Sequence, residues 1–175
     1  METASEPRTR SEVDVVRLAK DLALLQDRID VGDMLPRYAA AMDSHDADAL
    51  ASLFAEEIVV EAARIRWSGR DLAVKELCRH AFAHAASHHI IAMHRVTLDG
   101  DRASAVGYFH SVHLNDAERP NVHEDHGGWY LTRFRRTGEG WRFTYLKQVS
   151  VWQAEQKRPG APLTPALLDE MRRWR

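Results

Sequence analysis

Histidine is the residue type in this chain that points most directly to chemistry. Of the ten histidines, seven lie between His88 and His126. An imidazole titrates near neutral pH, so it can act as a general acid or base, and its nitrogens are also common metal ligands. The spacing therefore predicts proton transfer or metal binding in this part of the chain.

The histidines fall in segments that we expect to be strands, so alternation decides which of them share a face. Four runs are rich in β-branched and aromatic residues: His89–Leu98, Ala103–Leu114, His123–Arg135 and Trp141–Trp152. In the second run His113 shares a face with Ser111, and in the third His126 shares a face with Glu124. Alternation alone leaves open which face is interior.

Helical spacing comes before the strands. Apolar residues recur every three or four positions from Ser11 to Leu25 and again from Asp33 to Met42, which predicts two helices separated by Gly32. Asp46 is placed to cap a third, short helix that carries Leu50, Leu53 and Phe54. A fourth helix is expected over 71–86. Helices first and strands afterwards is the order of an α+β fold, not of an alternating nucleotide-binding fold.

Asp43 ends the second predicted helix. A carboxylate there faces the negative end of the helix dipole, so it needs a compensating partner, and a histidine could supply one. The alternative is that Asp43 only starts the turn into the next helix.

Composition limits the classes of function. The chain has 175 residues, of which 45% are hydrophobic and 29% charged, and its net charge is −2. These values favour one packed domain, and the charge argues against a nucleic-acid partner. No run is long and apolar enough for a membrane span or a secretory signal. The single cysteine fits a cytoplasmic protein. We predict a disordered tail at 1–10, a domain at 11–152, and a Pro-rich tail with a short helix at 153–175.

Several runs carry a resemblance to a known family. YAAAMDSHDADALASLFAEEIVVE, SHHIIAMHRVTLDGDRASAVGYF, GGWYLTRF and GWRFTYLKQVSVW resemble the SnoaL-like, scytalone dehydratase-like branch of the nuclear transport factor 2-like superfamily. The resemblance implies a cone: a curved antiparallel sheet wrapped around N-terminal helices and enclosing an apolar pocket.

The resemblance also implies the site. The family's helix-borne aspartate falls on Asp43 and its strand-borne histidine on His89, and in the family these two are hydrogen-bonded and perform acid/base chemistry. With His113 and His126 they make up the predicted catalytic set. The same overlay selects the inward face and predicts these substrate-binding side chains: Tyr38, Met42, Ile91, Phe109, Ser111, Glu124, Tyr130, Leu146 and Gln148.

The chain also departs from the family pattern. Met42 stands where the family has a tyrosine, and a second pocket tyrosine is replaced near Ala62. The family's second catalytic histidine falls near Asn115, two residues after His113. We therefore expect a substrate different from that of scytalone dehydratase.

Two classes of function remain open at this point. The first is a cofactor-independent lyase, namely a dehydratase or a related isomerase or polyketide cyclase, acting on a small apolar oxygenated substrate. The second is a non-catalytic small-molecule-binding or subunit protein of the same fold. A metal site built from His89, His113, His126 and Glu124 is an alternative that matches no compact motif. In either class we expect a homodimer or homotrimer.

Overall fold

The computed structural model describes the backbone of residues 15–157, with side chains described for all of these except 93, 94 and 155–157. Its elements are α1 (Val15–Asp43), α2 (Ala47–Leu53), β1 (Phe54–Ala62), β2 (Ile65–Ser68), α3 (Arg70–Ala81), β3 (Ala86–Asp99), β4 (Arg102–Leu114), β5 (Val122–Thr137) and β6 (Gly140–Lys157). The α+β class is confirmed. The predicted tail at 1–10 lies outside the described residues, as do residues 158–175, whereas residues 153–157, which we expected in the C-terminal tail, continue β6.

The first helix differs from the prediction. One helix of 29 residues, α1, replaces the two that we expected, and Gly32 and Pro36 lie inside it. A proline in a helix costs about 3 kcal/mol because it lacks the N–H and crowds the preceding turn. The continuous buried face around Pro36, which includes Met34, Leu35 and Tyr38, outweighs that cost.

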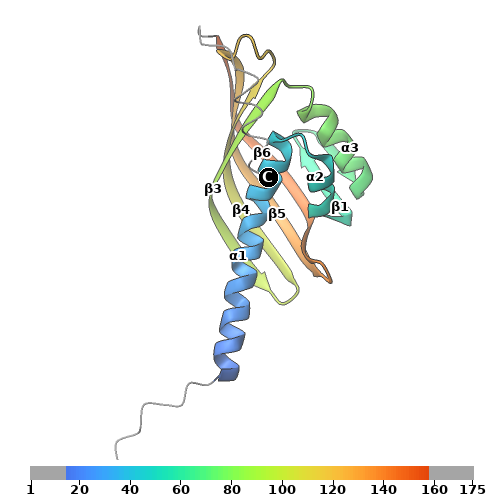
Figure 1. Ribbon diagram of the computed structural model, residues 1–175, viewed down its shortest axis with the longest axis vertical. Helices are drawn as coiled ribbons and strands as arrows, with labels where there is room; N and C mark the ends of the chain where they lie inside the picture. The colour runs from blue at the N-terminus through green and yellow to red at the C-terminus, as the bar shows by residue number, and fades with distance from the viewer. Residues whose placement is uncertain (1–14, 158–175) are drawn as a thin grey trace, which may run out of the picture.

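The sheet has six strands in the order β2-β1-β6-β5-β4-β3. Figure 1 shows the long strands β3 to β6 curving around the upper part of α1, with α2 and α3 beside β1. The four strands β3, β4, β5 and β6 form an antiparallel meander, in which each strand pairs with the next one along the chain. The antiparallel expectation is wrong at one pair, since β1 runs parallel to β6. The chain leaves β1 for the meander through β2 and α3, so no hairpin forces these two strands to oppose each other.

Local signals act where the sequence places them. The Asp46 side chain accepts a hydrogen bond from the Ala49 N–H and caps α2. Gly100 has a φ of 56° in the β3–β4 turn, a left-handed value that glycine adopts at little cost. Phe54 begins β1 and does not end α2.

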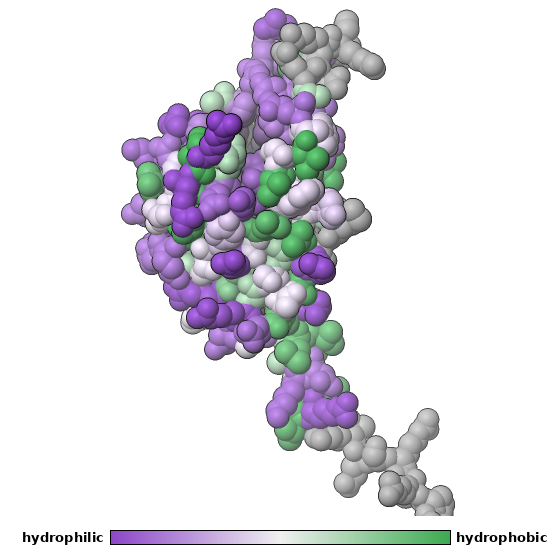
Figure 2. All heavy atoms as spheres, turned by 180° about the vertical axis from the view of Figure 1, so that it is seen from behind, coloured by the Kyte–Doolittle hydropathy of each residue, from purple (hydrophilic) through white to green (hydrophobic). Residues whose placement is uncertain are grey.

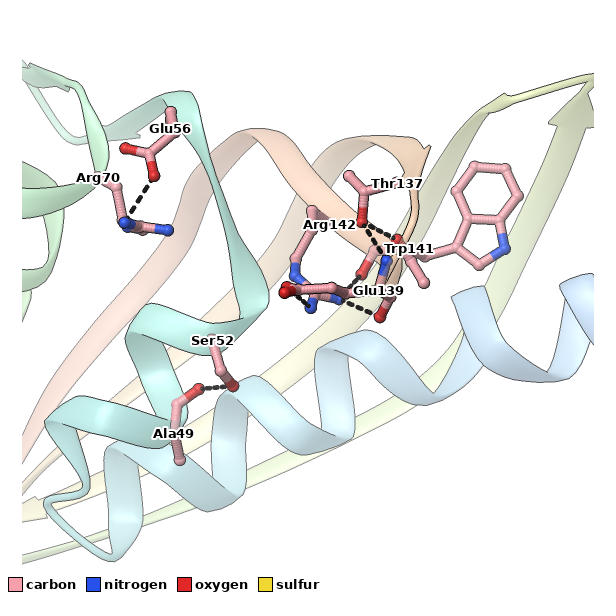
Figure 3. A network of polar contacts seen from close by, with 9 residues as sticks. Ala49, Ser52, Glu56, Arg70, Thr137, Glu139, Trp141 and Arg142 are labelled. Carbon is pink, nitrogen blue, oxygen red and sulfur yellow. Dashed lines mark hydrogen bonds and ion pairs between the residues drawn. The ribbon is translucent and has the colours of Figure 1, made fainter.

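Polar contacts lie around the β5–β6 turn and at the start of α3. The Thr137 hydroxyl donates to the Gly140 carbonyl at 2.7 Å across the β5–β6 turn, and Figure 3 shows Thr137 close to Glu139 and Trp141 there. In the same view Arg142 holds the carboxylate of Glu139 at 3.0 Å, and Arg70 at the start of α3 lies 2.6 Å from Glu56 in β1. Each of these surface ion pairs contributes at most about 1 kcal/mol to stability.

Strand register decides which residues face the helices. Ser111 of β4 pairs with His89 on one side and His126 on the other, and all three share the inner face. Bulges in β5–β6 pairing shift the alternation of β6, so that Phe143 and Leu146 both point inward. Inner-face aromatic residues and α1 form one core, in which Tyr38 contacts the rings of Phe54, Tyr130 and Phe143. Within residues 15–157 no helix is both long and apolar enough to span a bilayer.

Candidate active site

The C-terminus of α1 meets the start of β3 at Asp43 and His89. The Nδ1 of His89 lies 2.6 Å from Oδ1 of Asp43, and the His89 backbone N–H donates to Oδ2 at 2.9 Å. The Ser87 hydroxyl donates to Oδ1 at 2.8 Å. The side chains of His89 and Asp43 are 6% and 16% exposed. The carboxylate and the imidazole, 46 residues apart, are therefore a partly buried hydrogen-bonded pair.

Asp43 is ionised in this setting. Burial alone would raise the pKa of its carboxyl, but the hydrogen bonds from the His89 ring and backbone and from Ser87, with a Coulomb attraction whenever the His89 ring is protonated, hold the pKa below its ordinary value. Because the carboxylate accepts, Nδ1 of His89 carries a proton, and in the neutral imidazole Nε2 then keeps its lone pair. The same donors offset the unfavourable position of Asp43 at a helix C-terminus.

His113 lies at the centre of a group of histidine rings. Its ring centroid is 5.4 Å from that of His89, 5.1 Å from that of His126 and 4.7 Å from that of His84. Burial, reinforced by the neighbouring histidines and opposed by Glu124, lowers the pKa of His113 to about 4. His113 is therefore a neutral imidazole at pH 7 and cannot act there as a cationic acid.

A chain of polar contacts borders this group, from His84 just before β3, through Asn115 just after β4, to Glu124 in β5. His84 Nδ1 lies 2.7 Å from the Asn115 side-chain oxygen, and the Asn115 amide donates to Glu124 at 3.3 Å. Glu124 lies 3.6 Å from Nε2 of His126 without hydrogen-bond geometry, so that buried nitrogen has no hydrogen-bond partner within the described residues. The buried Ser111 hydroxyl beside it also has no hydrogen-bond partner within the described residues. These two polar atoms can accept or donate a hydrogen bond to a ligand.

The predicted substrate-binding side chains lie in two groups. Tyr38 and Tyr130 are buried with their rings 5.7 Å apart, and Phe109 lies 4.8 Å from Tyr130. Burial raises the pKa of both tyrosine hydroxyls, so they stay protonated. The buried members are Tyr38, Met42, Phe109, Ser111, Tyr130 and Leu146. The partly buried members are Ile91, Glu124 and Gln148.

A groove of about 420 Å³ leads to the Asp43–His89 pair between α1 and β3. Pro36, Ala39 and Ala40 line it on the helix side, and Ile90 and Ile91 line it on the strand side. Its walls are therefore mostly apolar, and Asp43 and His89 are the ionisable side chains among its lining residues. Such a lining suits a small apolar ligand with one or two oxygen atoms.

The histidine group does not have the geometry of a metal site. The His84 and His113 rings stack with an interplanar angle of 12°, so their nitrogens do not converge on one point. Among the side chains described, no group of three or more His, Cys, Asp or Glu residues is arranged to hold an ion. The metal alternative has no support in this geometry.

Three polar residues near the site were missing from the sequence-based set. Ser87 could have been found from alternation, because it lies two positions before His89 on the same face. His84 and Asn115 lie just outside β3 and β4, where no periodic pattern assigns a direction.

Comparison with known proteins gives the following matches. The family model described as SnoaL-like domain matches residues 23–147. No curated protein matches the chain.

Solved structures share the fold at low sequence identity. A protein assigned as a scytalone dehydratase from Novosphingobium aromaticivorans has a TM-score of 0.69 at 20% identity, covering 82% of this chain and 97% of its own. The hexachlorocyclohexane dehydrochlorinase LinA-type3 from Novosphingobium barchaimii has a TM-score of 0.69 at 16% identity, covering 83% and 99%. An NTF2-like protein with a cystatin-like fold from N. aromaticivorans has a TM-score of 0.64 at 25% identity, covering 81% and 92%.

Proposed function

Because this chain belongs to the SnoaL-like domain family, we propose that it is an enzyme of the lyase or isomerase type, which moves a proton with Asp43 and His89 and uses no cofactor. The observation that carries the proposal is the buried 2.6 Å contact between His89 Nδ1 and the Asp43 carboxylate. This contact leaves Nε2 of His89 as a base, and a general base contributes on the order of 10²–10⁴ in rate.

Dehydration is the reaction that we favour. Nε2 of His89 takes a proton from the carbon next to a carbonyl, and Asp43 stabilises the imidazolium that forms. The electron pair of the broken C–H bond forms the C=C bond, and the C–O bond to the β-hydroxyl breaks. The hydroxyl leaves as water with a proton from His126 or from the His89 imidazolium. Because His113 is neutral at pH 7, its role is to donate a hydrogen bond to the carbonyl oxygen, not to protonate the leaving group.

Similar proteins support an elimination reaction. Scytalone dehydratase and hexachlorocyclohexane dehydrochlorinase are named for the removal of water and of hydrogen chloride. Both eliminations break a C–H bond and release a group from the adjacent carbon, so both can use a positioned base. An isomerase or cyclase would use the same base without losing a leaving group.

A matched pair of variants tests the proposal. Purified wild-type protein is assayed for enone absorbance with β-hydroxy cyclohexanones as probes, and α-proton exchange in deuterium oxide is followed by nuclear magnetic resonance. We expect His89→Gln to lower both rates by about 10²-fold or more, and His123→Gln to leave them within about twofold. Circular dichroism checks that both variants fold. Conversion that survives His89→Gln would refute the assignment of the base.

A second function, ligand binding without chemistry, is favoured by one observation. The chain His84–Asn115–Glu124 already gives the Glu124 carboxylate a hydrogen-bond donor without a ligand. For a binding protein the probes would shift the resonances of inner-face residues, yet wild type would show neither conversion nor exchange.

A further inference from the structure

The N-terminal half of α1 carries an exposed apolar stripe. The members of this stripe are Val15, Leu18, Leu22, Leu25 and Ile29, and each is between 56% and 72% exposed. Figure 1 shows this half of α1 projecting beyond the sheet, and Figure 2 shows apolar surface on the projecting part. Monomeric proteins seldom leave so many large apolar side chains together in water.

The stripe is separate from the face that α1 packs on the sheet. Asp27 accepts hydrogen bonds from Arg136 and Trp141, so Asp27 marks the side toward the body. Arg28 lies at the border of that side, where one of its N–H groups donates to the Val96 carbonyl. Ile29 is 63% exposed although Val31, two residues later, is 1% exposed. The exposed stripe is therefore a second apolar face that points away from the body.

The spacing of the stripe is that of a helix-pairing surface. Its members are separated by three, four, three and four residues, which is the alternation of a and d positions in a heptad repeat. The repeat stops at Gly32 and Pro36, which would be the next two positions. A helix segment with no tertiary partner is also marginal in water, and within the described part of α1 no residue before Val31 is buried.

We propose that this stripe binds the same stripe of a second copy of the chain, with the two helices antiparallel. Leu22 then lies opposite Leu25 of the second copy, and Leu18 opposite its Ile29. Charge complementarity supports this orientation. Asp21 and Arg28 occupy the same heptad position, seven residues apart, and in an antiparallel pair that position faces its equivalent. Each Asp21 therefore meets an Arg28 of the second copy, twice in a two-fold symmetric dimer.

Charge reversal tests the register in the full-length protein. Asp21→Arg and Arg28→Asp each place like charges across the proposed interface, so sedimentation should show dimerisation weakened by about tenfold or more. An equimolar mixture of the two variants restores both ion pairs and should associate within about threefold of wild type. In a parallel pair Asp21 would not face Arg28, and the mixture would rescue nothing.

Cross-linking gives an independent result that other interfaces do not affect. In a Cys78→Ser background, Leu18→Cys chains mixed with Ile29→Cys chains should form a disulfide-linked heterodimer under mild oxidation. Ile29→Cys alone should not cross-link. A monomer at all concentrations, an Ile29→Cys homodimer, or association that neither charge reversal weakens would overturn the proposal. Leu22→Glu should dissociate the dimer while circular dichroism shows a folded monomer.

Discussion

Two histidine–carboxylate pairs lie on opposite faces of the sheet. They differ in whether the histidine keeps a ring nitrogen that faces no acceptor of the protein. On the inner face, His89 donates Nδ1–H to Asp43 and keeps Nε2 available. On the outer face, His123 lies with Nδ1 2.9 Å from the Pro120 carbonyl and Nε2 3.2 Å from Asp125. Both nitrogens of His123 therefore face acceptors of the protein itself.

The acceptors of the two pairs differ as well. Asp43 receives three hydrogen bonds, two from His89 and one from Ser87. Asp125 Oδ1 is close to His123 but lacks hydrogen-bond geometry. A short distance between an imidazole and a carboxylate is thus a poor guide to chemistry. The number of donors that orient the carboxylate and the presence of an uncommitted ring nitrogen are better ones.

The largest expected contrast comes from neutralising each carboxylate. Asp43→Asn removes the acceptor that fixes the His89 tautomer, so we expect turnover to fall by about 10²-fold. Asp125→Asn, the matched change on the outer face, should alter turnover by less than about twofold. Steady-state kinetics on whichever probe the wild type converts measures both. Equal losses in the two variants would remove the distinction between the pairs.

Titration by nuclear magnetic resonance sharpens the comparison for a third histidine. We expect the His113 ring to titrate with a midpoint of about 4, since burial and neighbouring histidines lower its pKa. Between about pH 6.5 and 4 the unfolded chain then binds more protons at this position than the folded one, so stability falls as pH decreases through that window. His113→Asn should flatten this part of the stability–pH curve in chemical denaturation. A midpoint near 6.5 would contradict the buried environment.

The smallest effect is expected at Ser87. Ser87→Ala removes one of three donors to Asp43 and should destabilise the fold by about 1 kcal/mol, with a loss in turnover of about fivefold. Ser104→Ala in β4, an exposed position on the outer face, is the control and should change neither. Denaturation midpoints and initial rates provide the two measurements. If Ser104→Ala had the same effect as Ser87→Ala, the hydrogen bond to Asp43 would have no special role.

Sequence reasoning succeeded where local chemistry decides the structure. The Asp46 cap, the turn at Gly100 and the four long strands follow from residue preferences over a few positions. It failed where distant contacts outweigh those preferences, as at Gly32 and Pro36, which the buried face of α1 carries through a continuous helix. The parallel pairing of β1 with β6 also depends on how the chain crosses between them, which no local pattern specifies.

The candidate site divides in the same way. The contact between Asp43 and His89 follows from the family overlay together with strand alternation. His84 and Asn115 reach the histidine group from segments without regular spacing, so only the three-dimensional arrangement reveals them. Ser87 is intermediate, since alternation places it on the correct face but does not identify Asp43 as its acceptor.

Pro36 gives α1 a compliant point between its two halves. Proline has no amide hydrogen, so the helix lacks the bond that would tie position 36 to the carbonyl of Gly32, and resistance to bending is lowest there. An added Cβ at Gly32 would meet nothing within 4 Å, so no neighbouring side chain supports the helix on that side. The projecting half of α1 can therefore bend relative to the half that packs on the sheet. We expect force on the projecting half to bend α1 near Gly32, while Met34, Leu35 and Tyr38, which are packed in the core, keep Asp43 aligned with His89.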